Sequence, residues 1–456
     1  YNGTVNVKGQ VLLINPWIYD FAAHNLWIEP LGLLTIAAAL RDRGYGVTVI
    51  DCLAPHAGAP TPRPDGSGKF QKSAIPTPDA VGFVPRRFGR YGMPAEQFEI
   101  ALASAPAPDL VMVGSGMTYW YPGVIRAIER VRARFGPVPV ALGGIYATLC
   151  PEHAQRRSGA DRILAGPGLV AALRMADEVT GSDSDADHYA DPRTWPPSAH
   201  DLIPRPFAGI ITSWGCPFHC TYCASRRLQP TFVQREPRSV VDEILGCARR
   251  GIRDFAFYDD ALLVKAERHI VPTLEAVVAE GVPANFHTPN GLHANAIDAS
   301  LARLMKAAGF SSVRLSLETT DPTRQRMTGG KVTTAAFERA VAALWEAGFH
   351  PGMLAAYILT GLPGQPLSEV EDTVRFVHGL GVQAKLALFS PIPGTPDGDR
   401  ALPAEADPLL HNNTVYPYLL DNEYVRRLQG IKLLAKKGNA MLSSHSVDPL
   451  HHPPHL

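Results

Sequence analysis

Short apolar runs alternate with amphipathic segments along most of the chain. In the first third, apolar runs at residues 10–16, 109–116 and 138–144 each end in a loop, and residues 30–44 and 122–135 have the apolar spacing of helices. Strands that alternate with helices at this spacing predict parallel βαβ units in a doubly wound α/β sheet. Ligands of such a sheet bind at the carboxyl ends of its strands.

The same alternation begins again in the middle of the chain and repeats six times. The amphipathic segments between the runs end at glycines, which is typical of helix C-termini. Six βα units predict a partial parallel barrel, whose chemistry belongs at the carboxyl ends of its strands. The expected strands are residues 207–214, 254–259, 284–288, 312–317, 352–359 and 384–389.

Three stretches depart from this alternation. Residues 53–94 are rich in proline and glycine with few periodic apolar positions, so we expect a long loop there. Residues 180–206 are acidic, aperiodic and rich in Ser, Asp and Pro, as an interdomain linker would be. The end of the chain leaves the barrel pattern, with a helix expected over residues 424–437 and an unstructured histidine-containing tail from residue 445.

These boundaries define the expected domains. We expect a Rossmann-like domain over residues 1–179, a linker over 180–206, a partial barrel over 207–396, and a C-terminal extension with a small helical segment over 397–456. Two domains also fit the length, because 456 residues exceed what one hydrophobic core usually serves.

Charge and cysteine usage narrow the class of protein. Forty-three basic residues balance 43 acidic ones, which argues against a large nucleic-acid footprint. No run of 18 apolar residues and no basic-then-apolar leader occurs, so neither a membrane span nor a secretory signal is expected. Six cysteines, three of them clustered, fit a reducing cytoplasm better than a disulfide scaffold.

The clustered cysteines are the strongest chemical signal in the chain. Cys216, Cys220 and Cys223 have C-x3-C-x2-C spacing directly after an expected strand. Thiolates are soft ligands that suit iron-sulfur clusters or zinc, and both usually take four protein ligands. Because no fourth cysteine is near, we interpret the triplet as the ligands of a 4Fe-4S cluster with one open iron. A zinc site is the alternative, but no His or Cys partner lies at finger spacing.

This triplet, with Tyr222 before its last cysteine, resembles the cluster motif of the radical S-adenosylmethionine (SAM) superfamily. The resemblance implies that SAM chelates the open iron and that the reduced cluster cleaves it to methionine and a 5′-deoxyadenosyl radical. An electron donor such as flavodoxin or ferredoxin is then implied as a partner.

The resemblance also gives roles to polar and glycine positions at the ends of the barrel strands. The segment FYDD would meet the SAM amino group, SLETTD would contact SAM, and LTGLPG would lie near the adenine. Each carboxylate has a structural alternative, as a helix cap or a surface charge. The expected SAM contacts are Tyr222, Asp259, Asp260, Asn290, Ser316, Glu318, Gly361 and Pro393.

The first domain resembles the cobalamin-binding domain found in front of many radical SAM enzymes. The order PLGLLTIAAALRDRGYGVTVID, DLVMVGSG and VALGG carries this resemblance. The D-x-H-x-x-G motif, whose histidine ligates cobalt in other cobalamin proteins, is absent, and Asp51 and His56 have the wrong spacing. The alternative is a domain that binds no cofactor and only shapes the active site. The expected cobalamin contacts are Ser115, Gly116, Thr118, Gly143 and Gly144.

The pairing of these two domains implies a function. Its commonest reaction is cobalamin-dependent methylation of an unactivated carbon, with a small molecule, a lipid or a peptide as substrate. The alternative within enzymes is a cyclase, ring-rearrangement or carbon-carbon coupling enzyme whose first domain binds no cobalamin. A sensor or scaffold that binds SAM or a corrinoid is a third reading, which the intact cysteine triplet disfavours.

Overall fold

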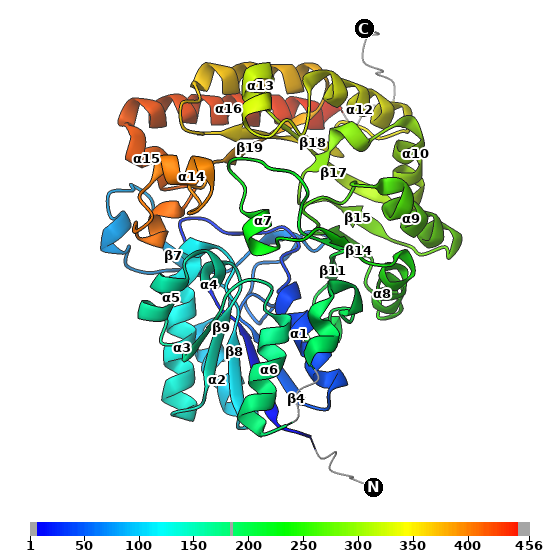
Figure 1. Cartoon of the computed structure of the whole chain (residues 1–456). Coiled ribbons are helices and arrows are strands. Elements are labelled where there is room, and N and C mark those ends of the chain that lie inside the picture. Colours follow the sequence, from blue (N-terminus) through cyan, green and yellow to red (C-terminus); the bar gives the residue numbers. More distant parts are fainter. Residues whose placement is uncertain (1–6, 183–185, 446–456) are drawn as a thin grey trace. The chain divides into compact units, whose positions relative to one another are not determined.

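The computed structural model describes residues 7–182 and 186–445, and within it the chain divides into two compact units (Figure 1). The first unit runs to Gly209 and includes Arg227–Gln229 and Asp407–Leu410. The second unit holds Ile210–Arg226, Pro230–Ala406 and the chain from His411 onward. The domain limits expected from the sequence stay predictions.

The first unit is built on a five-stranded parallel sheet in the order β10-β9-β8-β1-β4. The chain crosses from β1 to β4 on one side and later to β8 on the other, so the strand order reverses between β1 and β8. This switch point is where doubly wound sheets place their ligands. The strands are β1 (Gln10–Asn15), β4 (Gly46–Asp51), β8 (Leu110–Val113), β9 (Val140–Gly143) and β10 (Arg162–Leu164).

Apolar residues of this sheet and its helices form one core, as continuous Val, Ile and Leu runs in buried parallel strands should. Leu13 and Leu110 are fully buried against Ala37, Leu40 and Leu173. The helices of this unit are α1 (Leu31–Asp42), α2 (Ala95–Ser104), α3 (Tyr121–Phe135), α4 (Ile145–Leu149), α5 (Pro151–Arg157) and α6 (Leu169–Thr180).

Residues 53–94 are not the structureless loop that their composition predicts. They contain β5 (Gly68–Lys69), β6 (Lys72–Ala74) and β7 (Gly89–Tyr91), which pair antiparallel with one another or with β2 (Ile18–Asp20) and β3 (His24–Asn25). Strands of two or three residues are too short to show a period in sequence, and their pairing with distant residues stabilises them.

Residues of the expected linker pack on the first unit and belong to it by contacts. The buried His200 ring lies 3.0 Å from the Glu29 carboxylate, whose other oxygen accepts a 2.7 Å hydrogen bond from the Gly209 amide. Buried Arg205 donates to Asp51 at the end of β4. The helical turns in this stretch are η3 (Ala186–Ala190), η4 (Pro192–Thr194) and η5 (His200–Leu202).

The second unit is built on a parallel sheet whose strands follow chain order, β11-β14-β15-β17-β18-β19, as a partial barrel requires. Neighbouring strands of this sheet carry the buried rings of Phe257, Phe286 and Phe310, and the Phe257 ring stacks on the other two. The strands are β11 (Phe207–Ile210), β14 (Asp254–Phe257), β15 (Asn285–His287), β17 (Phe310–Glu318), β18 (Leu354–Thr360) and β19 (Gln383–Leu388), with β16 (Leu292–His293) beside β17. The long helices between them are α8 (Pro237–Arg249), α9 (Ile270–Ala279), α10 (Ala299–Ala308), α12 (Thr334–Glu346) and α13 (Leu367–Gly379).

Two elements of this unit differ from expectation. The strand expected over residues 207–214 is divided into β11 and β12 (Ser213–Trp214), because β12 leaves the sheet to pair with β13 (Val233–Gln234). The helix expected over residues 424–437 is longer and forms α16 (Asn422–His445), in which Asn439 bonds both the amide and the carbonyl of Ala384 at 2.8 Å.

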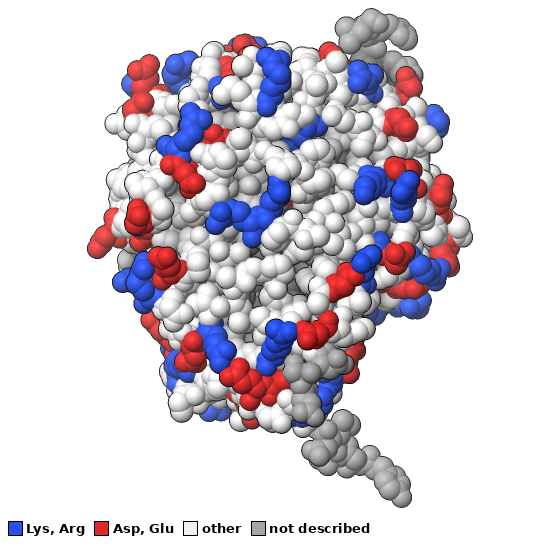
Figure 2. Space-filling view, in the orientation of Figure 1, with Lys and Arg blue, Asp and Glu red and all other residues white. Residues whose placement is uncertain are grey.

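The rest of the C-terminal segment is helical as well, with α14 (Pro396–Ala401) and α15 (Tyr416–Leu420) before α16. The tail was expected from residue 445, but this residue ends α16, and residues 446–456 lie outside the described residues. None of the helices that the structure describes is both long and apolar enough to span a membrane. Basic and acidic side chains are interspersed on the face in Figure 2, in keeping with the balanced charge of the chain.

Candidate functional site

The three clustered cysteines lie on the loop that follows β12 in the second unit. A hydrogen bond from the Cys223 amide to the Cys220 carbonyl, 3.1 Å long, closes a turn between them. Cys216 and Cys220 are half-buried and Cys223 is exposed, and all three are free thiols. Burial raises the pKa of the Cys216 thiol to about 11 and also raises that of Cys220. A bound metal centre would oppose this effect by stabilising the thiolates.

Asp259 hydrogen-bonds the chain just before the cysteine loop, and its expected contact with SAM stays a prediction. Its buried carboxylate accepts hydrogen bonds from the Thr212 amide and hydroxyl, at 3.1 and 2.8 Å, and from the Ser213 hydroxyl at 2.6 Å. His269 adds a 2.7 Å hydrogen bond to the Thr212 hydroxyl. Burial raises the Asp259 pKa to about 6, against the effect of these donors. The carboxylate therefore holds β12 in place.

Two further segments hold the cysteine loop from other sides. Asp397 at the start of α14 donates its amide to the Thr221 carbonyl at 3.0 Å and accepts from the Thr221 hydroxyl at 2.5 Å. Gly329, with φ of 117°, approaches so closely that a Cβ there would lie 3.1 Å from the Cys220 Cα and 3.2 Å from the His219 carbonyl oxygen. The loop geometry thus depends on contacts with residues more than 100 positions away.

Glu318 and Tyr222 lie beside Cys220 and share a partner, Lys331. The Lys331 ammonium lies 2.7 Å from the Glu318 carboxylate and 5.8 Å from the centre of the Tyr222 ring. Burial lowers the Lys331 pKa, but the neighbouring Glu318 carboxylate and Cys220 outweigh it and the net shift is upward. Burial, reinforced by Glu318, raises the Tyr222 pKa well above its usual value.

The other expected SAM contacts are spread over the ends of five strands, β14, β15, β17, β18 and β19. The Asn290 amide donates to the carbonyls of Tyr258 and Asp259 at 2.9 and 3.2 Å, so this side chain stabilises the turn after β14. Ser316 is buried on β17, and the Gly361 amide donates to Gln365 at 2.8 Å. Asp260 is exposed, and Pro393 is half-buried in the loop after β19. The structure therefore brings Tyr222 and Glu318 to the cysteines more clearly than it does these residues.

The expected cobalamin contacts lie at the carboxyl ends of β8 and β9 in the first unit. The Ser115 hydroxyl donates to the Gly143 carbonyl at 2.6 Å, and the Ile145 amide donates to the Ser115 carbonyl at 2.9 Å. Gly144 has φ of 94°, and a Cβ there would lie 2.3 Å from the Ser115 carbonyl oxygen. Ser115 and Gly144 therefore join two loops to each other.

The expected cobalamin contacts differ in how far they are exposed to solvent. Thr118 is buried, whereas Gly116 and Gly143 are half-buried and Gly144 is exposed. Glycines at the carboxyl ends of β8 and β9 leave the backbone uncovered by side chains, which suits close approach of a ligand. His56 does not offer a cobalt ligand, because its ring nitrogens contact the Gln71 amide oxygen at 2.7 Å and the Ala54 carbonyl at 3.1 Å.

Sequence reasoning missed Lys331 and gave no role to His293. Lys331 follows a Thr-Gly-Gly turn, and no periodicity or spacing connects it to the cysteines. His293 is buried with its ring 4.5 Å from that of Phe218 in the cysteine loop, and its Nδ1 has no hydrogen-bond partner among the described residues. Burial, assisted by Lys331, lowers its pKa to about 4, so the ring is neutral near pH 7.

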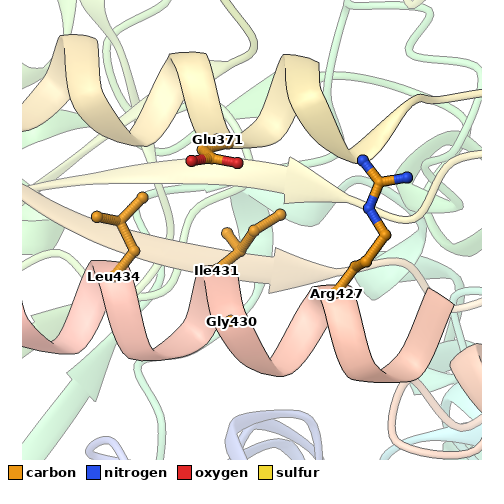
Figure 3. Close-up of a pocket in the computed structure, with 5 residues that line it drawn as sticks. All are labelled: Glu371, Arg427, Gly430, Ile431 and Leu434. Atoms are coloured by element: carbon orange, nitrogen blue, oxygen red, sulfur yellow. The ribbon is translucent and has the colours of Figure 1, made fainter. Parts of the chain in front are cut away.

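A pocket of about 300 Å³ lies in the second unit between α13 and α16 (Figure 3). It contains no cysteine and none of the expected cofactor contacts. Its lining residues are Glu371, Arg427, Gly430, Ile431 and Leu434.

A parallel sheet in chain order, with a C-x3-C-x2-C loop after its first strand, is the arrangement that the second unit offers for comparison with known proteins. Residues 210–377 match the family described as the Radical SAM superfamily. The matched region includes the cysteine loop and the strands β14 to β18, so this part of the second unit is similar to a radical SAM domain.

Curated relatives match over about three-fifths of their own length. "Uncharacterized methyltransferase PH0819" of Pyrococcus horikoshii is 26% identical over 56% of this chain and 61% of its own. "Cytidylyl-2-hydroxyethylphosphonate methyltransferase" of Streptomyces wedmorensis is 24% identical over 68% of this chain and 65% of its own. "Anaerobic magnesium-protoporphyrin IX monomethyl ester cyclase" of Synechocystis is 22% identical over 64% of this chain and 57% of its own.

Solved structures share the fold over both units. The radical SAM methyltransferase TsrM of Kitasatospora setae superposes with a TM-score of 0.64 at 20% identity, over 86% of this chain and 75% of its own. The cobalamin-dependent radical SAM enzyme OxsB superposes with a TM-score of 0.58 at 12% identity, over 93% of this chain and 56% of its own. The first unit therefore has the fold of a cobalamin-binding-type domain.

The cysteine loop fits a 4Fe-4S cluster in its donor chemistry. Three cysteine thiols, which are soft ligands, lie on one short loop. Each is available as a metal ligand because it is a free cysteine. Among the described residues, no three His, Cys, Asp or Glu side chains converge closely enough to hold a single metal ion. Cys216, Cys220 and Cys223 would hold the cluster.

Proposed function

We propose that this protein is a cobalamin-dependent radical SAM methyltransferase that methylates an unactivated carbon. The observation that carries the proposal is the combination of a cysteine-bearing radical SAM domain with a first unit whose fold TsrM and OxsB share. TsrM has been solved with cobalamin and a 4Fe-4S cluster, and OxsB with cobalamin and SAM. Two of the curated relatives are named methyltransferases.

When bound, the cluster and SAM would supply radical chemistry that removes hydrogen from the substrate, and cobalamin would supply the chemistry of methyl transfer. The chain's own task is to bind and orient these groups and to exclude water. Cys216, Cys220 and Cys223 hold the cluster, and Asp259 and Asp397 fix the loop that carries them.

The first unit supports cobalamin binding through its exposed glycine edge. Gly143 and Gly144 leave backbone open at the carboxyl ends of the strands, beside the switch point of the sheet. The chain offers no histidine at the usual spacing for cobalt ligation, so binding would rest on contacts with the corrin and its tail.

The proposed function also implies a substrate and an electron donor. We propose a small molecule, lipid or peptide, with reduction by an acidic electron carrier such as flavodoxin or ferredoxin in a reducing compartment. Free cysteines and an oxygen-sensitive cluster support the compartment.

The test is methyl transfer by anaerobically reconstituted protein. The protein is loaded with iron, sulfide and hydroxocobalamin, reduced with Ti(III) citrate, and given SAM carrying a CD3 group together with a small-molecule extract. We expect 5′-deoxyadenosine to form together with products that are 17 mass units heavier than their precursors. Formation of 5′-deoxyadenosine without cobalamin binding or label transfer would contradict the proposal.

That outcome would favour the second candidate, a cyclase or other carbon-skeleton enzyme of the same class. The match to magnesium-protoporphyrin IX monomethyl ester cyclase is the observation that favours it. Extract masses that change without the CD3 label would identify such an activity.

A further inference from the structure

The cysteine loop contacts a buried ion pair that no cofactor-binding pattern predicts. Glu318 ends β17 and Lys331 follows α11 (Pro322–Met327), and their charged atoms lie 2.7 Å apart. The side chains are only 11% and 14% exposed, so solvent screens their charges weakly.

The backbone fixes each member of the pair. Glu318 has φ of 71°, and the Thr319 amide bonds the Leu317 carbonyl across it at 2.9 Å, which is the strained form of γ-turn. Non-glycine residues hold such a conformation only where the surroundings impose it. The Lys331 carbonyl accepts a 2.9 Å hydrogen bond from Asn295. Gly329, two residues before Lys331, lies against Cys220.

Charge is distributed unevenly around the thiols. Lys331 acts favourably on the thiolates of both Cys220 and Cys223, and Glu318 acts unfavourably on Cys220. Tyr222 lies beneath the ammonium, and the neighbouring His293 carries no charge near pH 7. Asp260 adds a negative charge on the Cys216 side. Lys331 therefore offsets part of the negative charge near Cys220.

From this geometry we infer that the Glu318–Lys331 pair is a positioning element that sets the reduction potential of the cluster. One electron added to the cluster makes it more negative, so a nearby ammonium stabilises the reduced state and a nearby carboxylate the oxidised state. The paired charges nearly cancel, and removal of either one exposes the other to the cluster. This inference rests on the cluster of the proposed function but not on methyl transfer or on cobalamin.

The experiment is an EPR-monitored redox titration of the reconstituted full-length protein, without SAM, cobalamin or substrate. Lys331→Met should lower the midpoint potential and Glu318→Gln should raise it. Each variant should change the ratio of reduced to oxidised cluster at least tenfold at a fixed potential, which is 59 mV for a one-electron couple. Lys331→Arg keeps the charge and should stay near the wild type.

Two controls separate charge from structural damage. Arg324→Met breaks a comparably buried ion pair of the same unit, between Arg324 and Glu369, and should leave the potential unchanged. The double variant Lys331→Met with Glu318→Gln restores neutrality and should return to the wild-type potential. Iron and sulfide contents are measured for every variant, and if one single variant binds no iron, the other still tests the direction of its own shift.

Shifts of the two single variants in the same direction, or no shift in either, would overturn the inference. So would a double variant that keeps the shift of one single variant. Failure of methyl transfer leaves the titration unaffected, so the two hypotheses fail separately.

Discussion

In the second unit, the close approach of two loops depends on single residues. The clearest case is Gly329, which lies against the cysteine loop. With its φ of 117° and a separation of 3.1 Å between a built Cβ and the Cys220 Cα, a side chain there would be strained and tightly packed against the cysteine loop. We expect Gly329→Ala to displace the cysteine loop and to reduce iron bound on reconstitution by more than half. Iron and sulfide assays with absorbance near 400 nm would measure this.

The matched control is Gly330→Ala. Gly330 also has a positive φ, 63°, which costs a non-glycine residue about 1 kcal/mol, but a Cβ there meets nothing within 4 Å. Equal iron loss in both variants would show that backbone strain, and not contact with Cys220, controls cluster binding.

Some of these residues could be predicted from sequence and others could not. The cysteines could be, because their spacing is local and their chemistry specific. The hydrogen bonds of Asp259 to Thr212 and Ser213 could not be predicted, because a carboxylate at a strand end has the same sequence pattern whether it faces a ligand or a loop. Lys331 could not be predicted, because its partners Glu318 and Cys220 are distant in sequence and only the fold brings them together.

At the scale of elements, long periodic segments were predicted well and short ones poorly. The buried parallel strands β1 and β18 have apolar runs that sequence reveals directly. Pairing of β12 with β13, and of the short strands within residues 53–94, depends on distant partners and leaves no local period. The sequence therefore predicts the two sheets but not the irregular segments that shape their ligand-facing edges.

One ion pair joins two elements of the first unit, β4 and the segment before β11. Asp51 and Arg205 are each 1% exposed at their side chains, and Asn15 donates to Asp51 at 2.7 Å. Loss of one partner leaves a buried charge without compensation. We expect Asp51→Asn to destabilise the first unit by about 3–5 kcal/mol, seen in denaturant unfolding followed by circular dichroism.

An exposed ion pair in the same region gives the comparison. Arg41 and Asp201 lie 2.7 Å apart but are 45% and 46% exposed. Asp201→Asn should cost less than about 1 kcal/mol. If Asp51→Asn were equally mild, the buried pair would not fix this segment to the sheet.

At the scale of the whole molecule, each unit has its own parallel sheet and core, and each carries one set of expected cofactor contacts. The cysteine loop is fixed by residues of the second unit, namely Asp259, Asp397 and Gly329. The glycine edge is fixed by bonds within the first unit, through Ser115. Cluster binding and cobalamin binding should therefore be separable by mutation.

Two variants test this separation. The triple variant Cys216→Ser, Cys220→Ser and Cys223→Ser should bind no cluster yet retain hydroxocobalamin. Gly143→Leu should do the reverse, because a Cβ at Gly143 meets only ordinary contacts at 3.8 Å or more, so the fold tolerates the side chain while its bulk occupies the edge. Iron content, SAM cleavage and cobalamin retained after gel filtration are measured on both proteins. Loss of both cofactors in either variant would mean that one site completes the other, since the cores themselves are left intact.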